Sequence, residues 1–129
     1  MIHLLLVTRN KTAFSDFSGE LIKRNGVSVA WADSGEGALS LVSEKRFDLV
    51  VTDEELGDMA GLVFAKKLVT QHPMVNCAAV SPLSEEAFHE ASEGLGLQAK
   101  LPIPPGKKDA QNLLEGLLMI KGMASGARV

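Results

Sequence analysis

Residues 47–57 read Phe-Asp-Leu-Val-Val-Thr-Asp-Glu-Glu-Leu-Gly. The apolar run at residues 49–51 is typical of a strand buried on both faces of a parallel sheet. It ends at an acidic cluster that begins with Asp53, and Gly57 then supplies a turn. Open α/β sheets keep their functional groups at the carboxyl ends of their strands. Asp53 is therefore the first candidate functional residue, and the alternative is that its carboxylate only caps a loop or the next helix.

Length and charge limit the classes to which the chain can belong. Its 129 residues suit one domain with a single core, spanning residues 1–129. A net charge of -3 gives no attraction to nucleic acid or to an acidic membrane surface. No apolar run reaches membrane-spanning length, and the single cysteine, Cys77, suits a reducing compartment and a place in the core. We therefore expect a cytoplasmic protein that binds neither nucleic acid nor membrane.

Predicted strands and helices alternate along the whole chain. Strands are expected at residues 3–7, 27–32, 47–53, 75–81 and 97–103, and helices at 11–25, after Ser34, at 62–71, after Ser84 and from 107 to about 123. This rhythm indicates right-handed βαβ units and a parallel sheet between two helical layers. The fold class is α/β: a doubly wound, flavodoxin-like sandwich with five parallel strands in the order 2-1-3-4-5. The switch point of this order brings Thr8, Arg9 and Asp53 into one crevice.

Several motifs of catalytic and cofactor-binding proteins are absent from the sequence. There is no glycine-rich dinucleotide fingerprint, no P-loop and no G-x-S-x-G elbow. His3, His72 and His89 fall in three different predicted elements, so they do not form a metal-ligand pair. A small flavodoxin-like enzyme therefore has little support, and we predict that the chain is not an enzyme.

The pattern resembles the receiver domain of two-component response regulators, the CheY-like fold, over nearly the whole chain. The run that ends in Asp53 is similar to the family's third strand, which ends in the phosphoacceptor aspartate, and Gly61 matches the spacing of the loop that follows. Ser81 stands where the family has its hydroxyl switch residue. Ile103-Pro104 falls where the family has Lys-Pro. The resemblance implies a cis peptide bond at that proline.

The sequence departs from the family pattern around the proposed phosphoacceptor. The family has two acidic residues at the end of the first strand, which help to hold Mg²⁺, whereas this chain has Thr8 and Arg9 there. Ile103 replaces the family lysine. Lys100 stands at the position of the switch aromatic residue, and Gly57 stands in place of a proline.

These changes predict that Mg²⁺ binding is lost, so we expect no cofactor. Mg²⁺ needs hard oxygen ligands, and each unit of charge about 4–5 Å from it is worth roughly 7 kcal/mol at an effective dielectric near 20. We expect Arg9 to occupy the metal's place and to pair with Asp53, because its fork suits a carboxylate. Glu54 and Glu55 are expected to face solvent, and Trp31, on the second strand, to lie away from the crevice.

Two functions follow from the resemblance and its departures. The first is an atypical pseudo-receiver that acts through protein–protein interaction without Mg²⁺-dependent phosphorylation. The alternative is a working phosphoacceptor, phosphorylated on Asp53 by a histidine kinase, with Arg9 and Lys100 substituting for the metal and the lysine. We predict the first. Phosphoryl transfer depends mainly on positioning and charge neutralisation, and losing both Mg²⁺ and the family lysine removes most of that catalysis.

The last predicted helix carries more apolar residues than one buried face needs. One stripe, expected to face the sheet, is Ala110, Leu113, Leu117 and Ile120, and the flanks are Leu114 and Leu118 on one side and Met119 and Met123 on the other. A wide exposed apolar face marks an interface, unless neighbouring helices cover both flanks. We predict that the flanks contact a protein partner or a second copy, on the face of the fourth helix, fifth strand and last helix.

Overall fold

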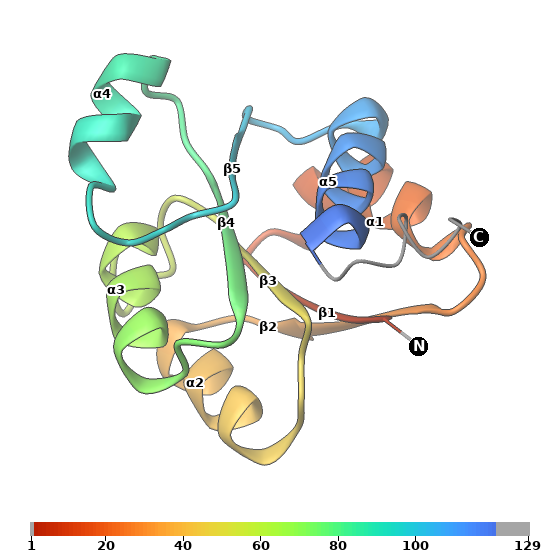
Figure 1. Cartoon of the computed structure of the whole chain (residues 1–129), viewed down its shortest axis with the longest axis horizontal. Coiled ribbons are helices and arrows are strands. Elements are labelled where there is room, and N and C mark those ends of the chain that lie inside the picture. The colour runs from red at the N-terminus through yellow and green to blue at the C-terminus, as the bar shows by residue number, and fades with distance from the viewer. Residues whose placement is uncertain (1, 121–129) are drawn as a thin grey trace.

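A computed structural model describes residues 2–120 of the chain. Its elements are β1 (Ile2–Val7), the 3-10 turn η1 (Lys11–Phe14), α1 (Ser15–Ile22), β2 (Val27–Ala32), α2 (Gly35–Glu44), β3 (Leu49–Thr52), α3 (Gly61–Gln71), β4 (Asn76–Val80), α4 (Glu85–Ala91), β5 (Ala99–Leu101) and α5 (Lys107–Ile120) (Figure 1). None of the helices among these residues is long and apolar enough to cross a membrane.

The five strands form one parallel sheet in the order β2-β1-β3-β4-β5, which confirms the predicted topology. Val7 at the end of β1 is in register with Thr52 at the end of β3. One residue further on, the Asp53 N–H donates to the Val7 carbonyl at 2.9 Å. The carboxyl ends of the two central strands therefore lie side by side, at the edge of the sheet where α/β proteins place their functional groups.

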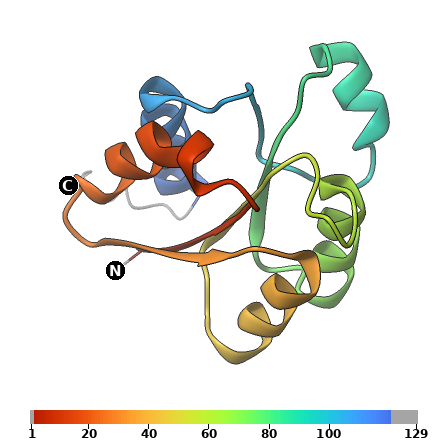
Figure 2. The same ribbon diagram turned by 180° about the vertical axis from the view of Figure 1, so that it is seen from behind.

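Helices cover both faces of the sheet, with α1 and α5 on one face and α2 and α3 on the other (Figures 1 and 2). Leu4 and Leu6 face the α1–α5 layer, whereas Leu5 and Val7 face the α2–α3 layer. This alternation explains the continuous apolar runs, because a central strand needs apolar side chains on both faces. Cys77 belongs to the second core as predicted, and burial raises the pKa of its thiol to about 12.

Helix boundaries follow local capping chemistry. Ser34 Oγ accepts the N–H of Gly37 at 3.0 Å, and Ser84 Oγ accepts the N–H of Ala87 at 3.1 Å, so both predicted N-caps are confirmed. Other boundaries differ from the predictions. The first helix begins as the 3-10 turn η1, and β5 has only three residues because Pro102 follows it directly and has no N–H for the sheet.

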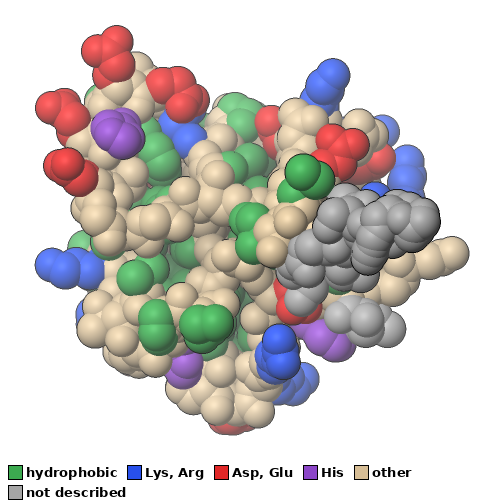
Figure 3. Space-filling model, viewed as in Figure 1, with side chains coloured by type: hydrophobic (Ala, Val, Ile, Leu, Met, Phe, Trp, Pro, Cys, Tyr) green, Lys and Arg blue, Asp and Glu red, His purple; other side chains and the backbone are tan. Residues whose placement is uncertain are grey.

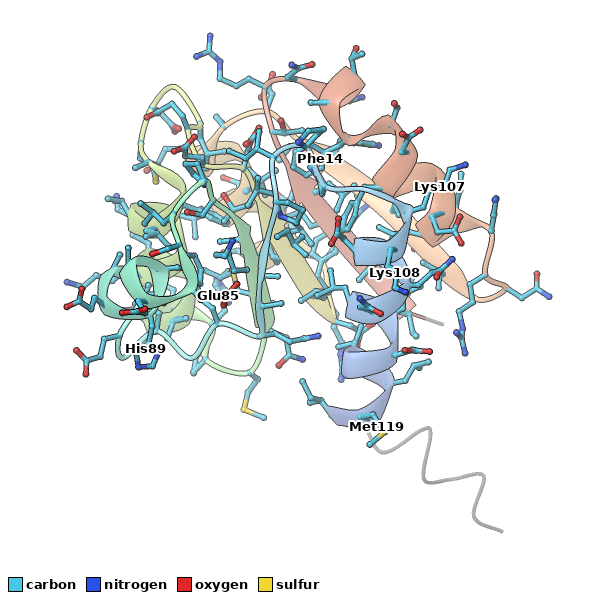
Figure 4. All side chains as sticks on the ribbon, turned by 90° about the horizontal axis from the view of Figure 1, so that it is seen from above. Phe14, Glu85, His89, Lys107, Lys108 and Met119 are labelled. Carbon is cyan, nitrogen blue, oxygen red and sulfur yellow. The ribbon has the colours of Figure 1, made fainter. Side chains whose placement is uncertain are left out.

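Helix α5 corrects the prediction made from its apolar pattern. Leu114 and Leu118 are buried, at 4% and 9% exposure, so they do not form an exposed docking flank. Ile120 is 57% exposed, so it does not complete the stripe that faces the sheet. The reason is that α5 packs against α1 as well as the sheet, which buries a second side of the helix. Met119 is 68% exposed on the last described turn (Figure 4), and Met123 lies outside the described residues.

The loop between β3 and α3 is tied to the start of α2. Asp58 accepts the N–H of Gly35 at 2.9 Å with Oδ1 and the N–H of Glu36 at 3.0 Å with Oδ2. These are two of the N–H groups that a helix cannot satisfy within itself. The bonds from Gly35 and Glu36 lower the pKa of Asp58 below its ordinary value of 3.8.

Because Leu118 is buried and Met119 is exposed, neighbouring substitutions on α5 should have opposite consequences. Leu118→Glu should lower the free energy of unfolding by about 3 kcal/mol or more, since it removes core packing and buries a carboxylate. Met119→Glu is the matched control and should change it by no more than about 0.5 kcal/mol. Urea unfolding monitored by circular dichroism measures both. Equal effects of the two substitutions would contradict the orientation of α5.

The Asp58 contacts predict a stability difference that depends on pH. A carboxylate with a lowered pKa in the folded state stabilises the fold above its unfolded pKa, and this stabilisation is lost as the pH falls through the folded pKa. Wild type should therefore be more stable than Asp58→Asn at neutral pH, and the difference should shrink below about pH 4. Thermal unfolding of both proteins across this range measures the effect. A difference that does not change with pH would contradict it.

Candidate functional site

Asp53 follows β3 at the carboxyl edge of the sheet, and both of its carboxylate oxygens are hydrogen-bonded. Oδ2 accepts the hydroxyl of Thr8 at 2.6 Å, and Oδ1 accepts the N–H of Glu54 at 2.8 Å. The first bond joins the ends of β1 and β3, and the second closes the turn into the following loop. The strand order therefore brings Thr8 and Asp53 together, as the sequence predicts.

Thr8 is held in a fixed orientation at the end of β1. Its side chain is buried at 2% exposure, and its hydroxyl oxygen accepts the N–H of Asn10 at 2.9 Å. Its own N–H donates to the carbonyl of Ala32 at the end of β2. A hydroxyl has one proton to give, and this network directs that proton at Asp53.

The predicted pair between Arg9 and Asp53 is not present in the structure. Among residues 2–120, no ion pair within 4.0 Å joins the two side chains, and Arg9 is exposed. Its guanidinium lies over Gly57, where an added Cβ atom would be only 2.9 Å from Nη1. The strand ends therefore bring Thr8 to the Asp53 carboxylate, whereas the Arg9 guanidinium lies over the loop that follows Asp53.

The loop after Asp53 requires a glycine at the start of α3. A Cβ atom on Gly61 would collide with the carbonyl oxygen of Asp53, and the Gly61 N–H donates to the Glu54 carbonyl at 2.7 Å. The eight-residue spacing from Asp53 to Gly61 thus has a steric reason. Glu54 and Glu55 are exposed as predicted, and Glu55 accepts the N–H of Gly57 at 3.0 Å.

Ser81 lies at the end of β4, one strand further along the same edge. Its side chain is buried, and its hydroxyl oxygen accepts the N–H of Leu83 at 3.1 Å. Ser81 lines a pocket of about 180 Å³ together with Glu54 and Gly61. Within the described residues no hydrogen bond joins Ser81 to Asp53. The hydroxyl therefore closes the turn after β4 in this structure.

The two positions after β4 that should neutralise charge do not direct a cation at Asp53. Ile103 is 51% exposed and offers only an apolar side chain, and the Ile103–Pro104 peptide bond is cis, as predicted. Lys100 Nζ lies 3.7 Å from Glu85 Oε2 on α4, the helix that carries the Glu85 label in Figure 4. Lys100 is largely buried, whereas Glu85 is exposed, so this ion pair is weak.

The residues at this edge do not fit the Mg²⁺ ion that the resemblance implies. Among residues 2–120, no three His, Cys, Asp or Glu side chains are grouped so that they could hold a metal ion. Thr8 directs a proton, not a lone pair, at Asp53 Oδ2. Mg²⁺ requires near-octahedral oxygen ligands at short distances, which this arrangement does not offer.

The sequence analysis missed a second group of residues beside Thr8. A pocket of about 350 Å³ opens between the ends of β1 and β2, and Thr8, Lys11, Trp31 and Asp33 contribute to its lining. Trp31 therefore shares a pocket with Thr8, and Asp53 is not among the residues that line it. A possible signal was the place of Trp31 at the end of the second strand, next to the edge where the crevice was predicted.

Comparisons with known proteins identify the family and the fold of the chain. The family model of the response regulator receiver domain matches residues 5–104. A response regulator receiver protein of Anaeromyxobacter sp. (strain Fw109-5) is 30% identical over 104 residues, which is 81% of this chain. The match covers only 43% of that relative, so the chain spans less than half of its length.

Solved structures show the same fold. The signal receiver domain of an HD domain-containing protein from Pseudomonas fluorescens Pf-5 superposes with a TM-score of 0.80 at 17% identity, covering 99% of this chain and 93% of that one. The chemotaxis response regulator CheY4 of Vibrio cholerae superposes with a TM-score of 0.79 at 21% identity, covering 92% and 99%. Because the family model matches most of the length of the chain, the chain belongs to the response regulator receiver domain family.

Proposed function

We propose that this chain is an atypical receiver in two-component signalling, which acts through protein–protein contacts without Mg²⁺-dependent phosphorylation. Membership in the family supports the coarser role, a receiver domain of two-component signalling. Receiver domains are in general signalling modules and not enzymes, and we propose no enzymatic activity for this chain. The finer proposal depends on the surroundings of Asp53.

The hydrogen bond from Thr8 to Asp53 is the observation that carries the proposal. At 2.6 Å the hydroxyl proton occupies one of the acceptor positions of Oδ2, at the place where the family has an acidic residue. The same hydroxyl oxygen accepts the Asn10 N–H, which holds Thr8 in place, so turning its proton away would lose the bond to Asp53. A metal ion would have to displace this bond and would gain no second carboxylate in return.

Within residues 2–120, no lysine or arginine forms an ion pair with Asp53, so the positive charge needed for phosphoryl transfer is not in place. Arg9 lies over Gly57, Lys100 pairs with Glu85, and Ile103 has no charge. The transferred phosphoryl group carries charge on three oxygens, and catalysis depends on neutralising that charge in place. We therefore propose that Asp53 accepts a phosphoryl group poorly from any donor.

The alternative function is a phosphoacceptor that a histidine kinase phosphorylates on Asp53. It has one favourable observation. Asp53 is only half-buried at the carboxyl edge, and the Arg9 guanidinium lies over the same loop, at Gly57. A rotation of the Arg9 side chain would be required to bring its charge to a phosphoryl group on Asp53. Labelling experiments separate the two functions.

The partner that we propose is a protein, because receiver domains interact with proteins such as kinases. Of the four apolar side chains predicted for the α4–β5–α5 face, only Met119 is exposed within residues 2–120. The surface of α4 is acidic, and Figure 3 shows its carboxylates gathered at one corner of the molecule. A partner at this face, whether a second copy or another protein, would therefore meet charged groups more than apolar ones.

Acyl-phosphate labelling tests the proposed function directly. Wild type incubated with acetyl phosphate should give no phosphoaspartate by intact-mass spectrometry, with or without Mg²⁺. The combined variant Thr8→Asp, Arg9→Asp and Ile103→Lys should gain Mg²⁺-dependent labelling, because it supplies two metal ligands and a cation. The same variant with Asp53→Asn is the control and should remain unlabelled. Mg²⁺-dependent labelling of wild type on Asp53 would overturn the proposal in favour of the phosphoacceptor.

Mg²⁺ binding is tested separately by NMR titration. In wild type, the amide signals of Asp53 and its neighbours should show no saturating shift up to millimolar Mg²⁺, since no three acidic, His or Cys side chains within residues 2–120 are grouped to hold it. The combined variant described above should show a saturating shift at the same residues. Ca²⁺ serves as a second hard cation, with less demanding geometry. Saturation in wild type would contradict the loss of the metal site.

A further inference from the structure

The pocket between β1 and β2 has the size and composition of a small-molecule site. Its volume of about 350 Å³ falls within the roughly 300–1,000 Å³ that such sites occupy. It lies at the carboxyl edge of the sheet, between the segment that starts the first helix and the first turns of α2. Its lining combines an aromatic ring (Trp31), an aliphatic side chain (Leu41), a cation (Lys11) and an anion (Asp33). A ligand could therefore make both apolar and charged contacts there.

The walls of the pocket suit a flat ring. The indole of Trp31 forms one wall, and Phe14 packs edge-on against that indole, with ring centroids 6.5 Å apart and an interplanar angle of 67°. Phe14 is buried, at 1% exposure, so it supports the indole from the core. Leu41 of α2 also lines the pocket, and Gly37 adds no side chain there. A planar heterocycle can stack on a supported aromatic face of this kind.

Two charged side chains at the pocket lack ionic partners. Lys11 Nζ lies 5.1 Å from the centre of the Trp31 ring, a cation–π contact. Within residues 2–120, neither Lys11 nor Asp33 forms a salt bridge. Because this ammonium group lies over the ring face, a ligand ring that stacks there displaces it, and the freed Lys11 side chain can then pair with a phosphate of the ligand. The exposed carboxylate of Asp33 can accept hydrogen bonds from hydroxyl or amino groups.

From these contacts we infer that the pocket binds a purine nucleoside monophosphate or a molecule of the same chemistry, a planar heterocycle that carries a phosphate. The ring takes the place of the Lys11 ammonium on the face of Trp31, Lys11 moves to pair with the phosphate, and Asp33 accepts from the sugar hydroxyls. Thr8 lines this pocket and also donates to Asp53, so one buried side chain is common to the ligand site and the receiver site. Ligand binding would then be an input to this domain that needs no phosphoryl transfer.

Trp31 makes the inference directly testable, because it is the only tryptophan in the chain. AMP and GMP are titrated into the wild-type protein without Mg²⁺, and Trp31 emission is followed with excitation at the red edge of its absorption band. Both nucleotides should quench the emission saturably and raise the midpoint of thermal unfolding. Because the assay contains neither Mg²⁺ nor a phosphoryl donor, its outcome is independent of the labelling result at Asp53.

Variants and simpler ligands identify the groups that bind. Lys11→Met should weaken nucleotide binding by about tenfold, as the loss of a charge-assisted contact would. Asp33→Asn should weaken it several-fold. Lys108→Met, at an exposed position on α5 (Figure 4), is the matched control and should bind like wild type. Isothermal titration calorimetry measures all three, and thermal unfolding checks that each variant is folded.

The outcomes that overturn the inference are distinct. No saturable quenching and no thermal shift at millimolar nucleotide would show that the pocket is not a nucleotide site. Equal binding of ribose 5-phosphate would show an anion contact without ring stacking, and equal binding of adenosine would remove the role of Lys11. If Lys11→Met and Lys108→Met weakened binding equally, the contact would be a general charge effect and the assignment of the pocket would fall.

Discussion

The hydroxyl of Thr8 donates to Asp53 at 2.6 Å, and the candidate site depends on this contact. It exists because β1 and β3 are adjacent parallel strands whose carboxyl ends are in register. It fixes one oxygen of Asp53, while the N–H of Glu54 fixes the other. Each oxygen thus accepts one hydrogen bond, and within residues 2–120 no three His, Cys, Asp or Glu side chains are grouped so that they could hold a metal ion. The chemistry at this edge of the sheet therefore depends on Thr8, the residue that follows β1.

The layered fold was predictable from the sequence because its causes are local or periodic. Continuous apolar runs such as residues 49–51 specify strands that are buried on both faces, and Ser34 and Ser84 specify helix starts through their own side chains. The helical pattern of α5 was a poorer guide. A helical wheel assigns one buried face, but Leu118 is buried and Ile120 exposed because α5 packs against α1 as well as the sheet. Such a second contact depends on the packing of distant segments.

One contact of the candidate site was predicted correctly, a second was wrong, and a neighbouring pocket was missed. Thr8 and Asp53 meet because strand order alone brings them together. The expected Arg9–Asp53 pair relied on charge complementarity alone, which is a weak guide for an exposed side chain, and the Arg9 guanidinium lies over Gly57 instead. The pocket at Trp31 was missed because it depends on where the first turn of the first helix lies relative to β2, and no sequence pattern encodes that distance.

The presence of Asp53 does not by itself show that phosphoryl transfer occurs here, because its carboxylate has a structural use. It accepts the Thr8 hydroxyl and the Glu54 N–H, so it fastens β1 to the start of the loop that follows β3. Gly61 is likewise explained by the carbonyl oxygen of Asp53, which leaves no room for a side chain. Ser81 closes the turn after β4 through the Leu83 N–H. Each of these family positions therefore has a role in holding the edge of the sheet together, and the phosphoacceptor function needs a separate source of cations that these contacts do not supply.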